Sequence, residues 1–337
     1  MSDTNSRFGV EIIGSGLCLP ESRLTNHDLE ECMETTSDWI VKRTGITERR
    51  RADLENGERT SQISIKAMNN ALADAKIDAS ELDLLLVATM TPDSPTPSIG
   101  CIVASKIGAG NIGAMDINAA CSGFVYTMSM ADAMIKSGAY KTIGIIGADT
   151  ITRFIEYSTA GRGAAILFGD GAGAMVLRRS EDANMGMIAH RMHSDGDGGK
   201  HLFIPISHLD FPEHIEFDES LCNRVQMNGK AVFKFAVNKF QQVIVDTLND
   251  AGMDADQVDH YVCHQANLRI LDSARERFGI PEDKLLVNIH KYGNTVAGSV
   301  PLVYAELMAS GTIKRGNKVM FLAFGAGLTW GSSLWQL

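Results

Sequence analysis

Short apolar runs alternate with longer amphipathic segments along most of this chain. Three short runs are rich in aliphatic and β-branched residues, which predicts buried strands at residues 83–89, 142–149 and 318–324. Three longer segments mix apolar and polar positions, which predicts helices at residues 62–76, 230–251 and 265–277. Strands and helices that alternate from end to end predict an α/β fold, with the helices packed against a sheet.

An internal repeat indicates that this arrangement occurs twice. Residues 71–87 (ALADAKIDASELDLLLV) and residues 247–263 (TLNDAGMDADQVDHYVC) align without a gap, and Asp78 matches Asp254. Each copy reads as a helix, an Asp-containing turn and a strand. Common helix–turn–strand chemistry would also produce one such match, but identities in register favour a duplication. A duplication predicts two similar halves, with a site where they meet.

Composition and charge narrow the range of partners. Of the 337 residues, 45% are hydrophobic and 21% are charged, so the chain can build a sizeable core. The net charge of −10 argues against nucleic acid as the main partner. No apolar run is long enough to span a membrane, and residues 1–12 lack the pattern of a secretory signal. We therefore expect a soluble cytoplasmic protein without a membrane partner.

The cysteines and histidines do not indicate a metal site. The six cysteines form no C-x-x-C pair, so neither a zinc ribbon nor a disulfide framework is predicted. Residues 190–201 (HRMHSDGDGGKH) contain three histidines and two aspartates, but their spacing fits no common metal site. We expect a solvated loop there and no bound metal.

Cys121 is the cysteine whose surroundings suggest chemistry. It lies between a predicted strand at residues 113–119 and an apolar predicted helix at residues 122–136. The partial positive charge at a helix N-terminus lowers the pKa of a thiol and favours the thiolate nucleophile. A buried structural cysteine would occupy the same position, so these two interpretations stay open on position alone.

His264 and Asn294 occupy comparable positions. His264 follows a predicted strand, where ligands of open α/β sheets bind, although a lone histidine is more often a solvated or capping residue. Asn294 follows Gly293 in a tight loop, where an asparagine is ordinarily a turn residue. A Cys, a His and an Asn at element ends form a plausible nucleophile set. Their spacing does not itself establish that they converge.

Several motifs resemble those of the β-ketoacyl-acyl-carrier-protein synthase III family, nearly from end to end. They are TSDWIVKRTGI at 36–46, DINAACSGF at 116–124, GRGAAILFGDGAGA at 161–174, HSDG at 193–196, HQANLRI at 264–270, GNTVAGSVP at 293–301 and FGAGLTWGS at 324–332. The resemblance implies a thiolase-like five-layered αβαβα fold built from two duplicated halves, working as a homodimer. We expect the N-terminal half at residues 1–180, with the nucleophile, and the C-terminal half at residues 181–337, with the histidine and asparagine.

The same resemblance implies roles for individual residues. It makes Cys121 the acyl-accepting nucleophile and adds His264 and Asn294 to complete the catalytic site. The coenzyme A substrate is expected at Trp39, Arg43, Arg162 and Asn267. The oxyanion hole is expected at the backbone N–H groups of Cys121 and Ala326, the latter replacing a family glycine. The acyl-carrier protein is expected at Gln265, Ala266, Asn267, Leu268 and Arg269.

The implied reaction is a decarboxylative condensation that initiates fatty-acid synthesis. An acyl-CoA would acylate Cys121, and malonyl-acyl-carrier protein would then lose carbon dioxide and attack the acyl group, with no tightly bound cofactor. A thiolase would need a second reactive cysteine near the C-terminus. An elongating condensing enzyme would need two histidines in its site. A non-catalytic subunit would have lost one of the three site residues. A related condensing enzyme of secondary metabolism, using other primers or β-keto acids, stays open.

Two surface features carry further expectations. The carrier protein of this pathway is acidic, so basic side chains should receive it, and candidates are Lys230, Lys234, Lys239, Arg269, Arg275 and Arg277. Ordinary solvated helix faces also carry such residues. Thr96 aligns with the family's dimer-interface loop that closes the neighbouring subunit's acyl pocket, where acetyl-specific members have phenylalanine. The smaller Thr96 predicts tolerance of primers longer than acetyl.

Overall fold

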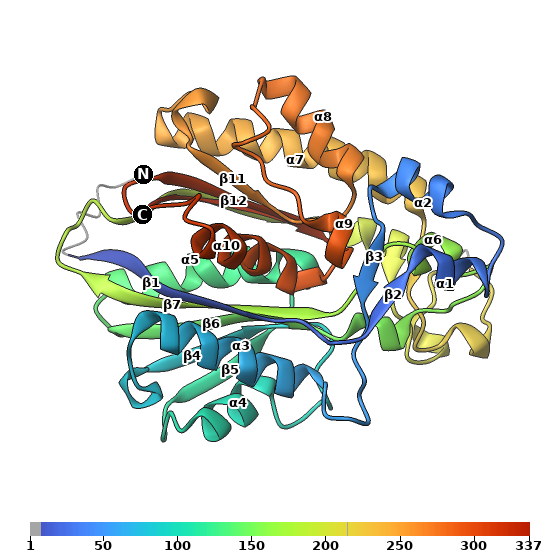
Figure 1. Cartoon of the computed structure of the whole chain (residues 1–337), viewed down its shortest axis with the longest axis horizontal. Coiled ribbons are helices and arrows are strands. Elements are labelled where there is room, and N and C mark those ends of the chain that lie inside the picture. Colours follow the sequence, from blue (N-terminus) through green and yellow to red (C-terminus); the bar gives the residue numbers. More distant parts are fainter. Residues whose placement is uncertain (1–7, 214) are drawn as a thin grey trace.

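The computed structural model describes residues 8–213 and 215–337, which form five layers (Figure 1). Two sheets alternate with three layers of helices. Helices α3 (Thr60–Ala75) and α4 (Ile99–Ile107) cover the outer face of the first sheet, and α7 (Gly229–Ala251) and α8 (Leu268–Phe278) lie outside the second. The central layer consists of α5 (Gly123–Lys136) and α10 (Ser299–Ala309). This is the predicted αβαβα arrangement.

The first sheet has five strands in the order β1–β7–β6–β4–β5. Strand β4 runs parallel to β5 and β6, whereas β7 is antiparallel to β6 and β1. Every residue of β4 and β6 is buried, which explains why both read as unbroken apolar runs. The strands are β1 (Gly9–Cys18), β4 (Leu84–Ala88), β5 (Gly113–Ile117), β6 (Thr142–Asp149) and β7 (Gly171–Ser180).

The second sheet repeats this order without an equivalent of β5. Its order is β11–β12–β13–β8, with β11 parallel to β12 and β13 antiparallel to both of its neighbours. The central helices α5 and α10 are buried on most faces because both sheets pack against them. The strands are β8 (Gly186–Ser194), β11 (His260–Cys263), β12 (Lys318–Gly325) and β13 (Thr329–Gln336).

The structure confirms the duplication seen in the sequence. Asp78 and Asp254 each begin a short 3₁₀ turn with a reciprocal capping box, in which side chain and backbone bond to each other. Each turn follows a long outer helix and precedes the first buried strand of its half, β4 or β11. The division at residues 180 and 181, which stays a prediction, falls between the end of β7 and the start of β8.

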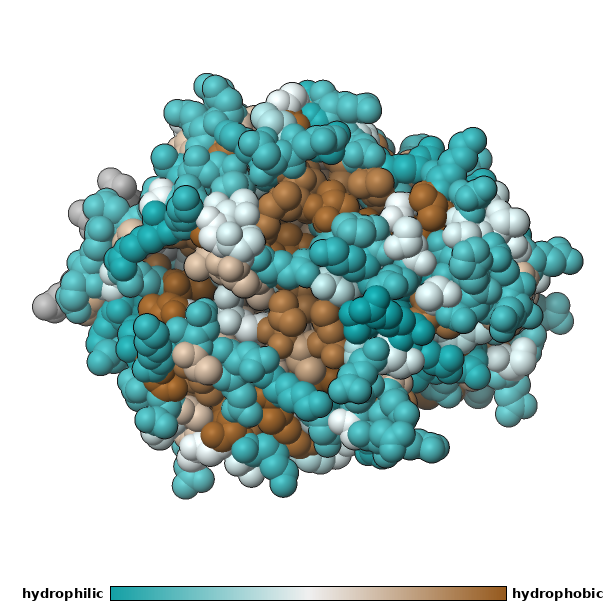
Figure 2. Space-filling view, viewed as in Figure 1, coloured by the Kyte–Doolittle hydropathy of each residue, from teal (hydrophilic) through white to brown (hydrophobic). Residues whose placement is uncertain are grey.

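Smaller elements gather at one end of the layers (Figure 1). Figure 2 shows the molecule from the same direction as Figure 1. This face is largely hydrophilic, with apolar side chains gathered in a few patches. The smaller elements are β2 (Arg23–Thr25), α1 (Asn26–Glu30), α2 (Ser37–Thr44), β3 (Glu48–Arg50), α6 (Arg162–Ala165), β9 (Leu202–Phe203), β10 (Gln226–Met227) and α9 (Ile289–Tyr292).

Two element predictions need correction. Residues 190–194 belong to strand β8, because they pair with β13, and only residues 195–201 are non-strand. Helix α8 begins at Leu268 rather than at residue 265, since Asn267 forms its N-cap. Residues 1–7, part of the segment where we expect no secretory signal, lie outside the described residues. Among the described helices, none combines the length and apolar character needed to cross a membrane.

Candidate active site

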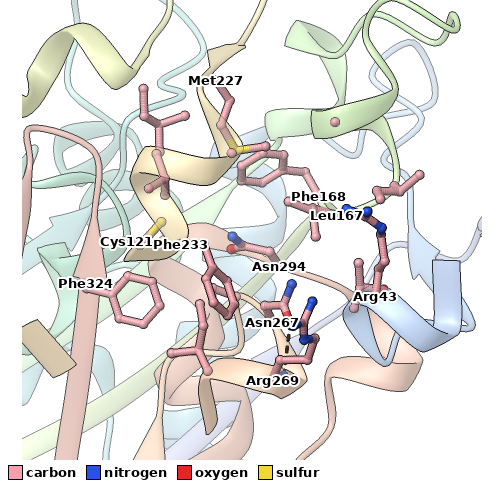
Figure 3. A pocket seen from close by; sticks show the side chains of 18 of the residues that line it. Arg43, Cys121, Leu167, Phe168, Met227, Phe233, Asn267, Arg269, Asn294 and Phe324 are labelled. Carbon is pink, nitrogen blue, oxygen red and sulfur yellow. Dashed lines mark hydrogen bonds between the residues drawn. The ribbon is translucent and has the colours of Figure 1, made fainter. Parts of the chain in front are cut away.

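A cavity of about 540 Å³ brings the three predicted catalytic residues together. Cys121, His264 and Asn294 all line it, although they come from three separate parts of the chain. In Figure 3, Cys121 lies toward one end of the cavity, while Arg43 and Arg269 lie toward the other. The cavity therefore has a buried reactive end and a basic mouth.

Cys121 lies in a tight turn at the start of the central helix α5. The preceding Ala120 has a left-handed backbone (φ 46°), and residues 120–122 form a 3₁₀ turn. Gly325, the last residue of β12, packs directly against this turn. A Cβ atom at Gly325 would lie 2.7 Å from the backbone nitrogen of Cys121, so no larger residue fits there without movement. The turn is thus held between the two halves.

Burial opposes the lowering of the Cys121 pKa that the helix N-terminus predicts. Burial raises the pKa of the Cys121 thiol, and the nearby Asp149 carboxylate raises it further, whereas the residue's own backbone N–H lowers it only in part. The side chain is 6% exposed, so desolvation outweighs the helix N-terminus. Burial therefore favours the protonated thiol over the thiolate, and a neighbouring base would assist its attack.

His264 lies in the site as an uncharged imidazole that can accept or donate a proton. It follows β11, and its backbone N–H donates to the carbonyl of Leu322 at 2.8 Å. Its ring stands edge-on to Phe324, with ring centroids 5.4 Å apart. Burial lowers the pKa of His264 to about 3, so the imidazole is neutral near pH 7. Neither ring nitrogen has a hydrogen-bond partner among the described residues, so both are available to a substrate.

Asn294 is fixed by its backbone and by one side of its amide. Its N–H donates to Leu167 O at 2.8 Å, and its carbonyl accepts from Gly169 N at 3.0 Å. Its Oδ1 accepts from Val296 N at 2.9 Å, which identifies the remaining amide nitrogen, Nδ2, as the free donor. The position therefore offers a hydrogen-bond donor that does not titrate.

A second, smaller cavity opens behind Cys121. It measures about 30 Å³ and is lined by the thiol and by apolar residues, among them Met90, Ile151 and Ile204. Ala326, predicted for the oxyanion hole, also lines it and directly follows Gly325, which touches the Cys121 turn. No hydrogen bond engages the Ala326 N–H within the described chain, so this N–H stays available as a donor.

The residues predicted for coenzyme A cluster around Trp39. Trp39 and Arg43 lie one turn apart on α2, and the Arg43 guanidinium lies 4.7 Å from the Trp39 ring centroid. Arg162 lies at the same distance from that ring. Trp39, Arg43 and Asn267 line the large cavity, whereas Arg162 reaches it only through its contact with Trp39.

The residues predicted for the carrier protein divide into two groups. Gln265 is 1% exposed, and its amide bonds to the backbones of Cys263 and Asn288, so it cannot meet a protein at the surface. Leu268 packs against Gly45. Ala266, Asn267 and Arg269 line the cavity, and the exposed Arg269 lies over the Phe233 ring at 5.3 Å. Gln265 is thus the one buried member of this set, and Arg269 is its exposed member.

Thr96 lies away from both cavities of its own chain. It is exposed, and its carbonyl accepts a hydrogen bond from Ser94 Oγ at 3.0 Å. Its predicted contact with a primer would therefore need a neighbouring subunit.

Sequence reasoning missed the aromatic walls of the large cavity. Four phenylalanine side chains line it, from three different segments of the chain: Phe168, Phe233 and Phe235 of α7, and Phe324 of β12. Each has the character of a core residue in its local pattern, so no sequence signal distinguishes it. No group of three or more His, Cys, Asp or Glu side chains within the described ranges is arranged to hold a metal ion.

Comparisons with known proteins agree on one family. Residues 115–196 match the family model described as 3-Oxoacyl-[acyl-carrier-protein (ACP)] synthase III, and residues 248–337 match the model of its C-terminal part. The β-ketoacyl-[acyl-carrier-protein] synthase III of Caldanaerobacter subterraneus subsp. tengcongensis is 41% identical over 328 residues, which cover 97% of this chain and 98% of that relative.

Solved structures are equally similar. The 3-oxoacyl-[acyl-carrier-protein] synthase III from Aquifex aeolicus VF5 has a TM-score of 0.89 and 39% identity, over 98% of this chain and 100% of the other. The priming β-ketosynthase of the R1128 polyketide biosynthetic pathway has the same TM-score and 32% identity, over 98% of this chain and 97% of the other.

The fold and the cysteine-containing cavity define a thiolase-type condensing enzyme. The chain belongs to the β-ketoacyl-[acyl-carrier-protein] synthase III family and is an acyltransferase.

Proposed function

We propose that this enzyme condenses an acyl-CoA primer with malonyl-acyl-carrier protein, as the first condensation of fatty-acid synthesis. The observation that carries the proposal is the single cavity that joins Cys121, His264 and Asn294. An apolar recess behind the thiol suits an acyl chain, and the basic mouth suits the phosphates of coenzyme A. The reaction has two stages that use the same three side chains differently.

In the first stage, the primer thioester acylates Cys121. Neutral His264 accepts the thiol proton as the sulfur attacks the thioester carbon. The N–H groups of Cys121 and Ala326 would stabilise the resulting oxyanion, as the proximity of Gly325 to the Cys121 turn suggests. The C–S bond to coenzyme A then breaks, and the proton passes from His264 to the leaving thiolate. His264 is neutral again, and Cys121 carries the acyl group.

In the second stage, malonyl-acyl-carrier protein supplies the new carbon atoms. Its thioester carbonyl accepts hydrogen bonds from His264 and from Asn294 Nδ2, which stabilise the enolate as carbon dioxide leaves. The enolate carbon attacks the acyl carbon on Cys121 and displaces the sulfur. The product is a β-ketoacyl thioester, and the freed thiolate takes up a proton from solvent water as the product leaves.

The mouth of the cavity gives both carriers a place to bind. Trp39, Arg43 and Arg162 would hold the nucleotide of coenzyme A by stacking and charge. Arg269, with the exposed Lys230 nearby on the cavity wall, would receive the acidic carrier protein.

The enzyme is also proposed to act as a homodimer through strand β5. This strand forms one edge of the first sheet, and its Met115 side chain is 41% exposed. The segment that follows Thr96 is fastened to the same edge, because Ile99 N and Gly100 N donate to Asp116 at 2.7 and 2.8 Å. Dimerisation here would bring Thr96 toward the partner's primer cavity.

A primer panel tests this function. Purified enzyme is incubated with acetyl-, butyryl- and octanoyl-CoA, and the acyl-enzyme is weighed by mass spectrometry before and after malonyl-acyl-carrier protein is added. We expect acylation by primers longer than acetyl and discharge to a β-ketoacyl product. The same panel with Thr96→Phe should lose the longer primers first. Unchanged chain-length preference would remove Thr96 from the primer site.

A further inference from the structure

The turn that carries Cys121 has a counterpart in the other half of the chain. Residues 296–298 form a 3₁₀ turn before α10, as residues 120–122 do before α5, and Ala297 takes the position of Cys121. The first residue of each turn has a left-handed backbone, with φ values of 46° and 51°. Such values are uncommon for residues other than glycine, so the shared geometry identifies the two turns as equivalent.

The strands beside these turns end in different residues. Strand β12 ends at Gly325, which abuts the backbone nitrogen of Cys121 and places no side chain there. Strand β6 ends at the equivalent position with Asp149, whose Oδ2 accepts a hydrogen bond from Ala297 N at 3.0 Å. At Ala297 the N–H is therefore occupied by a carboxylate oxygen of the protein. At Cys121 the equivalent N–H is left for an oxygen of the substrate.

Asp149 also holds one wall of the primer cavity. Its Oδ1 accepts hydrogen bonds from Met90 N at 2.9 Å and from the backbone and hydroxyl of Thr91 at 3.1 and 2.8 Å, and Thr89 Oγ1 donates at 3.2 Å. Met90 lines the apolar cavity behind Cys121. Asp149 is fully buried, so its loss would leave buried donors such as Met90 N without a partner.

The other carboxylate oxygen reaches the turn that follows Asn294. That turn includes Val296, whose N–H holds Asn294 Oδ1, and Ala297, whose N–H is bound by Asp149. We propose that Asp149 is a positioning residue for condensation. Its carboxylate oxygen lies at the Ala297 N–H, which corresponds to the place of the reacting oxyanion at the Cys121 N–H. In this position Asp149 fixes the Asn294 turn against the wall of the primer cavity. This inference rests on the proposed function, since it assigns Asn294 to the decarboxylating stage.

The test separates the two stages in an Asp149→Asn variant. An amide keeps the side-chain shape but presents an NH₂ group where one carboxylate oxygen accepted hydrogen bonds. We expect carbon dioxide release to fall to about a tenth of wild type, with acylation within about threefold. The remaining amide oxygen still accepts from Met90 and Thr91, whereas the NH₂ group cannot accept from Ala297 N at the Asn294 turn. Acylation is spared since removal of the charge also lowers the pKa of the Cys121 thiol.

Asp132→Asn is the matched control. Asp132 is also a buried aspartate, 1% exposed, on α5, the helix that follows the Cys121 turn, but it bonds to Lys136 and Met187 outside the cavity. We expect this variant to match wild type in both stages. Thr89→Val gives a milder second variant in case Asp149→Asn fails to fold. It removes a bond to Oδ1 and keeps the bond from Ala297 N to Oδ2, so it only loosens the carboxylate that holds the Asn294 turn and should lower carbon dioxide release by a smaller factor.

The outcomes distinguish this inference from the function on which it rests. If wild type is never acylated by any acyl-CoA, the proposed function fails regardless of the variants. If wild type is active and Asp149→Asn behaves like Asp132→Asn, the inference is overturned. Equal loss of acylation and carbon dioxide release, with Thr89→Val unaffected, would likewise overturn it.

Discussion

Burial acts in opposite directions on the two titratable groups of the catalytic site. It raises the pKa of the Cys121 thiol and lowers that of the His264 imidazole to about 3. Both groups are therefore neutral in the resting enzyme, and proton transfer between them is unfavourable until a thioester is present. The charged state arises only when the oxyanion hole can offset it.

Alkylation of Cys121 should show the raised thiol pKa directly. Iodoacetamide reacts with the thiolate, so the alkylation rate below the pKa rises about tenfold per pH unit. We expect the rate at Cys121, followed by peptide mapping, to keep rising above pH 9, where free cysteine has begun to level off. A plateau below pH 8 would show that the thiolate is preformed after all.

His264 and Asn294 should differ in which stage they affect. Asn294→Ala should still become acylated, because its amide is needed only by the malonyl carbonyl, and should release carbon dioxide at least about a hundredfold more slowly. His264→Ala should slow both stages, since it removes the base as well as a donor. Stopped acylation in Asn294→Ala, measured by intact mass, would contradict this division.

At the scale of the elements, helix α8 presents one accessible basic residue at the cavity mouth. Arg275 pairs with Glu282, and Arg277 donates to Gln241, whereas Arg269 forms no ion pair among the described residues. Arg269→Glu should raise KM for malonyl-acyl-carrier protein about tenfold at low salt, with less effect at high salt. Arg277→Glu, a matched charge reversal on the same helix, should change KM little. Equal effects of the two would indicate only the loss of general positive charge.

The bounds of helices and strands were predictable where an element is uniformly buried. They were less predictable where side chains form hydrogen bonds with the backbone. Strand β6 and helix α7 agree with their predicted ranges to within a residue, because apolar runs and a C-terminal Gly252 mark them. Helix α8 begins later than predicted because the side-chain amide of Gln265 forms hydrogen bonds with the backbones of neighbouring segments. The sequence does not show these bonds. The pattern of residues 190–194 predicts a loop although they belong to β8, because this edge strand carries polar residues.

The site was predictable in its chemistry but not in its shape. Cys121, His264 and Asn294 lie at the ends of helices or strands, and the family motifs identify them. The reactive groups could therefore be predicted from the sequence. The cavity walls come from Phe168, Phe233 and segments far apart in sequence, which resemble core positions until the halves are assembled. The thiol pKa also depends on Asp149, whose proximity only the assembled fold reveals.

At the scale of the whole molecule, the proposed dimer can be tested at its edge strand. Met115→Lys would place a charge in the β5 interface and should shift the protein from dimer to monomer in analytical ultracentrifugation. Met192→Lys is the control, since Met192 is equally exposed, at 41%, on the edge strand of the second sheet. A monomeric wild type, or equal effects of both variants, would contradict a β5 interface.

The central claim is that one cysteine carries the primer between the two carriers. The direct measurement is intact-mass and peptide mapping of wild type, Cys121→Ser and Cys263→Ala after exposure to butyryl-CoA and then to malonyl-acyl-carrier protein. Cys263 is the matched control, because it is also a buried cysteine whose thiol pKa burial raises. We expect one acyl group on Cys121 in wild type and Cys263→Ala, discharged with release of carbon dioxide, and none in Cys121→Ser. An acyl group on any other residue, or one that malonyl-acyl-carrier protein does not discharge, would contradict the account.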